Sequence, residues 1–341
     1  MRIGVLTSGG DCPGLNAVIR SVVHRAVVDH DDTVIGIEDG FLGLIEGRAR
    51  PLGLDDVQGI LTRGGTILGS ARVARDRLRE GVARTAELRR ALGIDALVAI
   101  GGEGTLIAAG LFSAAGLPVV AVPKTIDNDI DATDVTFGHD TAVHVATEAI
   151  DRLKTTAESH QRVVVVELMG RHTGWITLHA GMAGGAHGIL IPERPFDVEE
   201  VCQMVEERFA RGKKFAIVAV AEGAEPRPGT MRFAHGSIDA YGHRLFGGIG
   251  TRLAGEIAQW IGKESKPVIL GHIQRGGTPT AQDRVLATRF GWYAVEAVHK
   301  GAFGHMTALR GTDIQLVPIG DAVARLKTVP EIRWTEAEAV L

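Results

Sequence analysis

The sequence is poor in the residues that mark several large classes of protein. Its two cysteines, Cys12 and Cys202, are too few for a disulfide framework or a cysteine-based metal cluster, and they suit a reducing compartment. Aromatic residues make up 5% of the chain, and no run of about 18 apolar residues predicts a membrane span. The net charge of −4 offers no basic field to nucleic acid or to an anionic membrane. The first residues also lack the pattern of a signal peptide. We therefore expect a cytoplasmic protein that binds neither nucleic acid nor membrane.

What the sequence has instead is an alternation of short apolar runs and helical patterns. Alternating β and α elements predict mainly parallel sheets with helices on both faces, and this many strands suit two sheets better than one. Strands are expected at Ile3–Leu6, Thr33–Ile37, Ala96–Ile100, Val119–Val122, Val163–Leu168, Gly188–Ile191, Phe215–Ala221 and Val268–Leu270. Helices are expected near Asn16–Asp29, Val82–Leu92, Leu106–Ala115, Thr141–Thr155, Trp175–Met182, Val198–Arg211, Ile249–Ile261 and Ala281–His299.

The most informative segment is Lys124–Ile130, which follows an apolar run that ends at Pro123. Ligands of open α/β sheets bind outside the carboxyl ends of the strands. In an extended segment residues two apart point the same way, so Asp127 and Asp129 are expected to face one cavity. One carboxylate is then available as a base while the other helps to hold a metal ion. The alternative reading of these residues alone is a surface turn rich in Asp and Asn.

Two glycine-rich turns also follow predicted strands, at Ser8–Asp11 and Gly101–Thr105. Glycine lets the backbone approach a phosphate, and helix N-termini present free N–H groups to it. Neither turn matches the P-loop or the Rossmann fingerprint. Glu103 is placed to reach a magnesium ion carried by phosphates, because magnesium prefers one or two carboxylates plus phosphate oxygens.

Arginines and further acids occur at other predicted loops and strand ends. Arg72 follows a run of glycines and small residues, Arg171 follows the strand Val163–Leu168, and His272 with Arg275 suggests an anion pocket. Glu222 is placed to accept hydrogen bonds from sugar hydroxyls. For each arginine the alternative is an ordinary solvated side chain. Acids, arginines and glycine loops without a covalent nucleophile are typical of direct phosphoryl transfer.

Taken together, these stretches resemble 6-phosphofructokinase, in the family's order and over nearly the whole chain. The stretches that carry the resemblance are Thr7–Asn16, Pro123–Ile130, Ser159–Arg162, Met169–Arg171 and Gly271–Gly277. The segment Glu222–Gly262, with Tyr241–His243 and Gly247–Gly250, resembles the actinobacterial branch, which includes both ATP- and pyrophosphate-dependent enzymes.

The resemblance implies two Rossmann-like α/β domains, mainly parallel sheets sandwiched by helices, with the active site between the domains. It implies MgATP and fructose 6-phosphate as substrates, Mg²⁺ as cofactor, and a homotetramer with shared active sites. It places a phosphate-donor domain at residues 1–138 plus about 274–324, and a fructose 6-phosphate domain at residues 139–273 plus about 325–341.

The resemblance also assigns roles to residues. Asp127 is the expected base toward the sugar 1-hydroxyl, and Thr125, Arg171 and Arg72 are expected to stabilise the transferring group. Asp129 and Glu103 are the expected magnesium ligands. The expected donor-site residues are Gly9, Phe41, Arg72, Gly102, Glu103, Gly104, Thr105 and Lys124. The expected substrate-site residues are Thr125, Asp127, Asp129, Arg162, Met169, Gly170, Arg171, Glu222, Lys266, His272 and Arg275, with Arg162 and Lys266 supplied by a neighbouring subunit.

Four positions depart from the family pattern or point in opposite directions. Glu103 stands where the family usually has Asp, and its longer side chain is expected to move or hydrate the metal. Lys266 stands where the family usually has Arg and lacks its planar fork, so weaker sugar-phosphate binding is expected. Gly104 leaves open the space that pyrophosphate enzymes fill with Asp, which favours ATP. Lys124 favours pyrophosphate, but a lysine can fold aside more easily than an acid in the nucleotide path. ATP is therefore the expected donor, and pyrophosphate is the alternative.

A second departure concerns regulation. Regulated bacterial members build a site for ADP and phosphoenolpyruvate from arginines and a glutamate, of which Arg20, Arg152, Arg211 and Lys213 are present. His24, Leu54 and His187 stand where such members carry Arg, Arg and Glu, so weak or altered control is expected.

Two rival functions are a kinase of the NAD or diacylglycerol type and a non-catalytic sugar-phosphate sensor. The first shares only the Gly101–Thr105 element, and the second should have lost Asp127 and Arg171.

Overall fold

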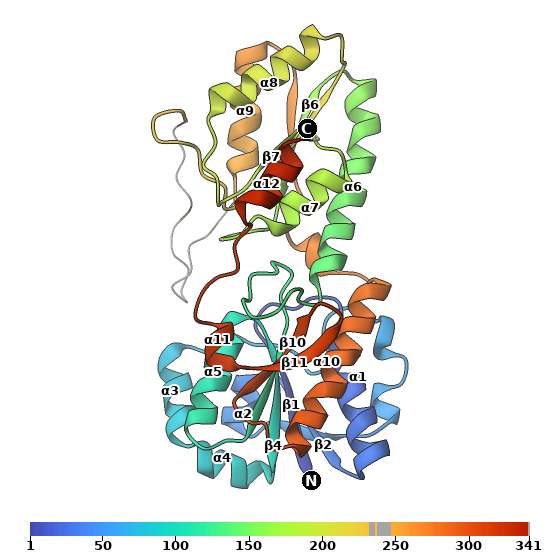
Figure 1. Cartoon of the computed structure of the whole chain (residues 1–341), viewed down its shortest axis with the longest axis vertical. Helices are drawn as coiled ribbons and strands as arrows, with labels where there is room; N and C mark the ends of the chain where they lie inside the picture. The colour runs from blue at the N-terminus through green and yellow to red at the C-terminus, as the bar shows by residue number, and fades with distance from the viewer. Residues whose placement is uncertain (232–235, 237–246, 340–341) are drawn as a thin grey trace. The chain divides into compact units, whose positions relative to one another are not determined.

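The computed structural model describes residues 1–231, 236 and 247–339 and divides the chain into two compact units (Figure 1). Unit 1 comprises residues 1–141 and 275–327, and unit 2 comprises residues 142–274 and 328–341. The chain therefore passes between the units three times. Among the described helices, none combines the length and the apolarity that a membrane span requires.

Unit 1 is built on a seven-stranded sheet in the order β11-β10-β5-β4-β1-β2-β3. Its pairings are parallel except at the two edges, where β10–β11 and β2–β3 are antiparallel. Its strands are β1 (Arg2–Ser8), β2 (Thr33–Ile37), β3 (Ala49–Leu52), β4 (Ala96–Gly101), β5 (Val119–Pro123), β10 (His305–Arg310) and β11 (Asp313–Pro318).

The helices of unit 1 cover this sheet. Helix α5 packs on β4 and β5, and α10 packs on β5 and against α1. The helices are α1 (Leu15–His24), α2 (Phe41–Glu46), α3 (Arg75–Ala83), α4 (Thr85–Leu92), α5 (Glu103–Ala114), α10 (Ala281–His299) and α11 (Ile319–Ala322). Shorter turns are η1 (Arg25–Asp29), η2 (Asp55–Val57), η3 (Ile60–Thr62) and η4 (Gly271–Arg275), the last of which spans the unit boundary.

Unit 2 is built on a four-stranded, all-parallel sheet in the order β7-β8-β6-β9. Helix α9 packs on β6 and β9 and against α8, whereas α7 packs on β7 and β8 and against α12. Its strands are β6 (Val163–Leu168), β7 (Gly188–Leu190), β8 (Ala216–Ala221) and β9 (Ser265–Ile269). Its helices are α6 (His139–Ser159), which begins in unit 1, α7 (Trp175–Ala183), α8 (Val198–Ala210), α9 (Ile249–Ile261) and α12 (Glu331–Glu338).

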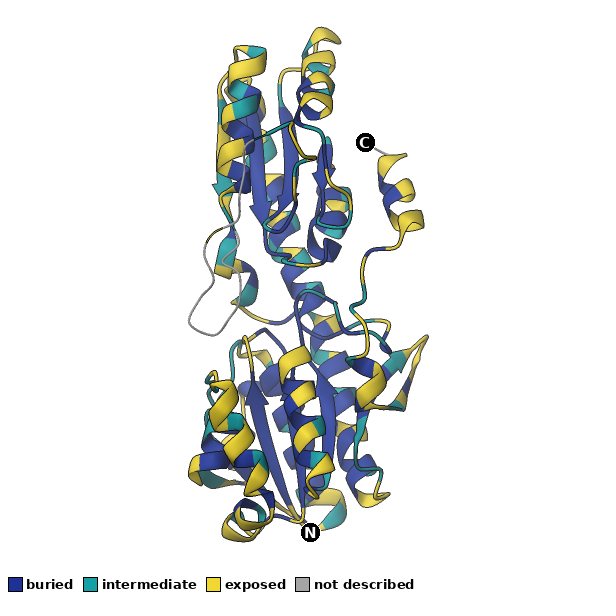
Figure 2. Cartoon of the chain, turned by 90° about the vertical axis from the view of Figure 1, so that its left-hand side faces the viewer, coloured by how far each residue is buried: buried dark blue, intermediate teal, exposed yellow. Residues whose placement is uncertain are grey.

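Burial follows from the parallel pairing. Every residue of β4, β5, β6 and β8 is buried, because helices cover both faces of a parallel sheet (Figure 2). The cores are aliphatic, as the low aromatic content predicts; that of unit 1 centres on Leu6, Ile37, Leu97 and Leu106. Because these strands are buried, polar side chains that could bind a ligand are found at the strand ends and in the loops that follow them.

The predicted fold class is confirmed, and the errors concern particular strands and one helix. The strands β3, β10 and β11 were not predicted, and β9 begins at Ser265 rather than Val268. The edge strands β3, β9 and β11 carry proline and polar residues, and β10 beside the edge is also partly polar, which interrupts the apolar run that marks a central strand. The predicted helix Val82–Leu92 is two helices that meet at Arg84. The predicted motif Tyr241–His243 lies outside the described residues.

Candidate functional site

The carboxyl ends of three neighbouring strands of unit 1 lie in one row. Ser8 of β1 pairs with Gly101 of β4, and Gly101 pairs with Pro123 of β5. The two glycine turns and the Asp127 loop therefore leave the sheet side by side. A Cβ atom at Gly9 would lie 3.4 Å from Thr105 Oγ1, which shows how closely the first two turns pack. The row thus brings together the donor-site residues predicted from three separate stretches of sequence.

Lys124 lies within this row and is buried. Its backbone N–H donates to the carbonyl of Gly101 at 2.9 Å, and its ammonium donates to the carbonyl of Gly10. Burial lowers the pKa of Lys124, and Arg275 lowers it further, while Cys12, Asp11 and Asp129 act in the opposite direction. The side chain is therefore folded onto the first glycine turn.

The loop that carries the two carboxylates is not extended, which corrects the sequence-based premise. Asn128 adopts a φ of +51°, in the left-handed region, between Asp127 and Asp129. Asn tolerates this conformation better than most residues because its side chain bonds locally. The N–H of Asp127 donates to Thr125 Oγ1 at 3.1 Å, so the first half of the loop turns back on itself. Alternation along a strand therefore cannot be used to argue that the two carboxylates face one cavity.

The second glycine turn opens helix α5. Gly102 caps the helix, and the backbone N–H groups of Thr105 and Leu106 both donate to its carbonyl at 2.9 Å. Glu103 and Gly104 are exposed in the first turn, where the positive end of the helix dipole favours a bound anion. A Cβ atom at Gly104 would meet no described atom within 4 Å. The turn therefore leaves open space beside Gly104.

The carboxylates of unit 1 suit a magnesium ion that arrives with phosphates. Asp129 Oδ1 is buried and accepts no hydrogen bond from any described residue. No three His, Cys, Asp or Glu side chains of the described chain are grouped so as to hold a metal by themselves. Magnesium needs only one or two carboxylates when phosphate oxygens complete its shell. Asp129 fits this role, and the exposed Glu103 has the freedom to join it.

The loop that contains Arg72 reaches the first glycine turn. Thr7 Oγ1 donates to the carbonyl of Gly69 at 2.8 Å, and Ser70 Oγ donates to the carbonyl of Gly9 at 2.5 Å. Arg72, two residues later, is exposed. These bonds hold the loop that contains Arg72 against the first glycine turn.

Phe41, which the family resemblance places in the donor site, requires a correction. Its ring is 2% exposed and stacks on Phe112, with 5.3 Å between the ring centroids. A buried ring that stacks on another core ring has no exposed face for a ligand. Phe41 therefore supports α2 and α5 from within the core.

Unit 2 brings its own strand ends together. Leu168 of β6 pairs with Ala221 of β8, and the N–H of Glu222 donates to the carbonyl of Leu168 at 2.8 Å. Arg171 Nε lies 3.6 Å from Glu222 Oε1. A Cβ atom at Gly223 would lie 1.9 Å from the carbonyl oxygen of Arg171, so only glycine fits there. The predicted arginine and the predicted sugar-binding glutamate are thus neighbours.

Two further predicted residues of unit 2, Met169 and Gly170, are buried beside the end of β8. Gly170 has a φ of +143°, and its carbonyl accepts from the N–H of Gly223 at 3.0 Å. The N–H of Met169 donates to Gln274 Oε1 at 3.3 Å. Both backbones are therefore fixed by bonds to the neighbouring strand end and to the segment after β9.

Arg162 and Lys266 converge on one carboxylate. Arg162 lies 3.5 Å from Glu264 Oε2, and Lys266 lies 2.8 Å from Glu264 Oε1. They lie at the starts of the neighbouring strands β6 and β9, because Val163 pairs with Ser265. This pair forms a cationic patch at the start of β6 and β9.

His272 and Arg275 both lie in the short helical turn η4. The boundary between the units falls between Gln274 and Arg275, so His272 belongs to unit 2 and Arg275 to unit 1. The guanidinium of Arg275 donates to the carbonyl of Asp11 at 3.2 Å. The anion pocket predicted for this pair stays a prediction.

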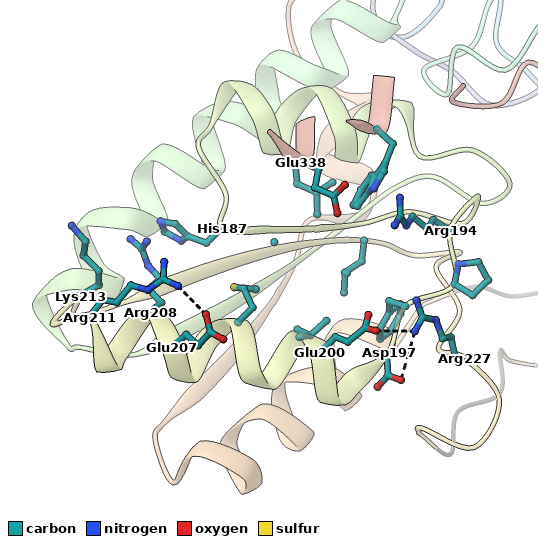
Figure 3. A pocket seen from close by; sticks show the side chains of 18 residues that line it. His187, Arg194, Asp197, Glu200, Glu207, Arg208, Arg211, Lys213, Arg227 and Glu338 are labelled. Carbon is teal, nitrogen blue, oxygen red and sulfur yellow. Dashed lines mark hydrogen bonds and ion pairs between the residues drawn. The ribbon is translucent and has the colours of Figure 1, made fainter. Parts of the chain in front are cut away.

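A cavity of ≈ 480 Å³ in unit 2 was not predicted as a whole (Figure 3). His187, Arg208, Arg211 and Lys213 line one end. Burial lowers the pKa of His187 to about 4, helped by Arg208 and Lys154, so the ring is neutral at pH 7. Sequence spacing gave no signal for Arg208, because it is one of several charged residues on the outer part of α8.

Comparison with known proteins links these two half-sites to one family. A family model described as Phosphofructokinase matches residues 2–298. ATP-dependent 6-phosphofructokinase 2 of Streptomyces coelicolor is 68% identical over 340 residues, which are 100% of this chain and 100% of that protein. Pyrophosphate–fructose 6-phosphate 1-phosphotransferase of Amycolatopsis methanolica is 60% identical over 339 residues, which are 99% of each.

The fold is also similar to that of a solved structure. Phosphofructokinase of Pichia pastoris in the T-state matches with a TM-score of 0.83 and 32% identity. The match covers 99% of this chain and 36% of that chain, so this chain spans little more than a third of the Pichia chain. Relatives of this chain are named for different phosphate donors, and similarity alone does not choose between them.

Proposed function

Because this chain belongs to the phosphofructokinase family, we propose that it transfers the γ-phosphoryl group of MgATP to the 1-hydroxyl of fructose 6-phosphate. The products are fructose 1,6-bisphosphate and ADP, and the reaction is a step of glycolysis. The alternative is the reversible reaction with pyrophosphate as donor. In this proposal unit 1 binds the phosphate donor and unit 2 binds the sugar phosphate.

The mechanism follows from what phosphoryl transfer demands of a protein. Asp127 removes the proton of the 1-hydroxyl as the phosphoryl group arrives, so its carboxylate needs only transient proton affinity. Thr125 donates to the transferring group, and Arg171 and Arg72 neutralise the charge that develops on it. Asp129 and Glu103 would hold a magnesium ion bound with the donor, which would supply further charge neutralisation. Glu222 and His272 bind the sugar, together with the backbone at Met169 and Gly170.

The observation that carries the choice of ATP is the open space beside Gly104. A nucleotide needs room for its α-phosphate next to the first turn of α5, and a Cβ there would meet no described atom within 4 Å. The position of Lys124 supports the same choice, because its ammonium already binds the carbonyl of Gly10. A lysine folded in this way takes little of the space that the donor needs.

A parallel assay of the two donors tests the proposal. Purified enzyme with magnesium and fructose 6-phosphate is expected to form fructose 1,6-bisphosphate with ATP and not with pyrophosphate. A coupled assay for fructose 1,6-bisphosphate measures both reactions under the same conditions. Turnover with pyrophosphate alone would reverse the choice of donor, and turnover with neither would remove the proposed function.

We further propose that the enzyme works as a homotetramer in the cytoplasm, with active sites shared between subunits. The patch formed by Arg162 and Lys266 around Glu264 supports this proposal. Two cations that share one exposed carboxylate can exchange it for the 6-phosphate of a sugar bound to a neighbouring subunit. Arg275, which lies in unit 1 beside Asp11, supplies a further positive charge for binding phosphate.

Control by ADP and phosphoenolpyruvate is expected to be weak. The Nδ1 atom of His187 accepts from the N–H of Ile217 at 2.9 Å, so the ring proton sits on Nε2 and the ring has no lone pair left for a metal ion. Arg211 in the same cavity is already paired with Glu207 at 2.9 Å (Figure 3). Millimolar phosphoenolpyruvate is expected to shift the fructose 6-phosphate saturation curve by less than about twofold, below the couplings of about 5–150-fold typical of allosteric sites. A larger shift would contradict this reading of His187.

A further inference from the structure

The loop that follows β5 is held by two of the last residues of unit 1, Leu326 and Lys327. Leu326 forms an antiparallel bridge with Ile130, and the N–H of Lys327 donates to the carbonyl of Asp129 at 2.9 Å. Arg325 pairs with Asp131 on the exposed side of the same segment. About 200 residues of sequence separate this segment from the loop, so only the fold brings them together.

The ammonium of Lys327 makes a convergent set of hydrogen bonds within this contact. It donates to Asn128 Oδ1 at 2.9 Å, to the carbonyl of Thr133 at 2.9 Å and to the carbonyl of Asp134 at 2.8 Å. These bonds use the three N–H donors of a lysine. They tie the beginning of the loop to its end at a single point.

Asn128 is the residue through which this contact acts. Its side-chain oxygen accepts from Lys327 and also from the N–H of Thr136 at 3.1 Å. Its backbone has a φ of +51°, a conformation that an L-residue other than glycine keeps only when its surroundings hold it. Because Asn128 stands between Asp127 and Asp129, its conformation sets the direction in which both carboxylates leave the chain.

We propose that Lys327 is a positioning residue for phosphoryl transfer, which holds Asn128 in its left-handed conformation and thereby aims Asp127 and Asp129. The role of the two carboxylates rests on the function proposed above, whereas the tether itself does not. Lys327 acts through Asn128 and through the carbonyls at the end of the loop.

Steady-state kinetics of two matched variants test whether Lys327 positions the two carboxylates for catalysis. Lys327→Met and Arg325→Gln each remove one positive charge from the same segment, but only the first removes the bonds to Asn128. Lys327→Met is expected to lower kcat about 10²-fold, because small misplacements of catalytic groups cost that much. The KM values are expected to change little. Arg325→Gln is expected to keep kcat within about twofold, as exposed substitutions usually do.

Hydrogen exchange read by mass spectrometry tests the tether without relying on activity. In the wild-type enzyme the peptide that covers residues 126–137 is expected to be protected, since the N–H of Thr136 is bonded to Asn128. Lys327→Met is expected to speed exchange in this peptide while β4 and β5 stay protected, and Arg325→Gln is expected to leave it unchanged. A general loss of stability would instead speed exchange throughout unit 1.

The outcomes separate the two proposals. A wild-type enzyme that is inactive with both donors removes the proposed function, while the exchange result still decides whether Lys327 holds the loop. Unchanged exchange and kcat in Lys327→Met overturn the inference, and so do equal effects in both variants. If Lys327→Met does not fold, rapid exchange of residues 126–137 in the wild type overturns it, and strong protection there supports it.

Discussion

Asp127→Asn is expected to lower kcat by about 10²–10⁴-fold, the range typical of losing a general base. The amide has nearly the same shape as the carboxylate but cannot accept the proton of the sugar hydroxyl. Asp127 lies in the loop that follows the buried strand β5, and its N–H is bonded to Thr125 Oγ1, so the substitution leaves the local backbone bonds in place. The measurement is the steady-state rate of fructose 1,6-bisphosphate formation at saturating substrates.

A control for this variant comes from the same loop. Asp131→Asn removes one negative charge four residues later, where the carboxylate pairs with Arg325 near the surface. It is expected to keep kcat within about twofold, as substitutions away from special features usually do. Equal losses in the two variants would show that the loop needs its net charge and would remove Asp127 as the base. Nearly full activity in Asp127→Asn would do the same.

Much of the site was predictable because the strands that carry it are central. The runs that became β1, β4, β5, β6 and β8 are continuous and apolar, and a buried parallel strand requires this pattern. Once such strands are placed, the residues that follow them are assigned to one edge of a sheet. This reasoning brought the turn at Gly9, the turn at Gly102 and the Asp127 loop to one place, where the register of β1, β4 and β5 puts them.

The parts that sequence could not predict depend on backbone groups or on contacts between distant segments. Lys327 donates to two carbonyl oxygens, and carbonyl oxygens are present at every residue and leave no mark on the sequence. The left-handed conformation of Asn128 cannot be predicted from the sequence either, since Asn occurs in many turns. Phe41 was assigned to the donor site by the family resemblance alone, and its burial against Phe112 was not visible in the sequence.

Gly104→Asp is expected to lower kcat/KM for ATP by about 10³-fold, because a like charge placed against a phosphate costs several kcal/mol. The fold should accept the substitution. A Cβ atom at this position meets no described atom within 4 Å, and an acid in the first turn of α5 is favoured by the helix dipole. A large loss would therefore report on the donor site rather than on stability.

Two companion variants separate the causes of that loss. Gly104→Ala adds only a Cβ and is expected to retain most of the ATP activity, and Gly104→Asn has the size of Asp without its charge. A larger loss in Gly104→Asp than in Gly104→Asn measures repulsion of the nucleotide phosphate, whereas equal losses assign the effect to size. Both donors are assayed for each variant. If Gly104→Asp uses ATP as well as the wild type does, the nucleotide does not pass beside Gly104. The case for ATP would then have to rest on the folded position of Lys124 alone, which is too weak to decide the donor.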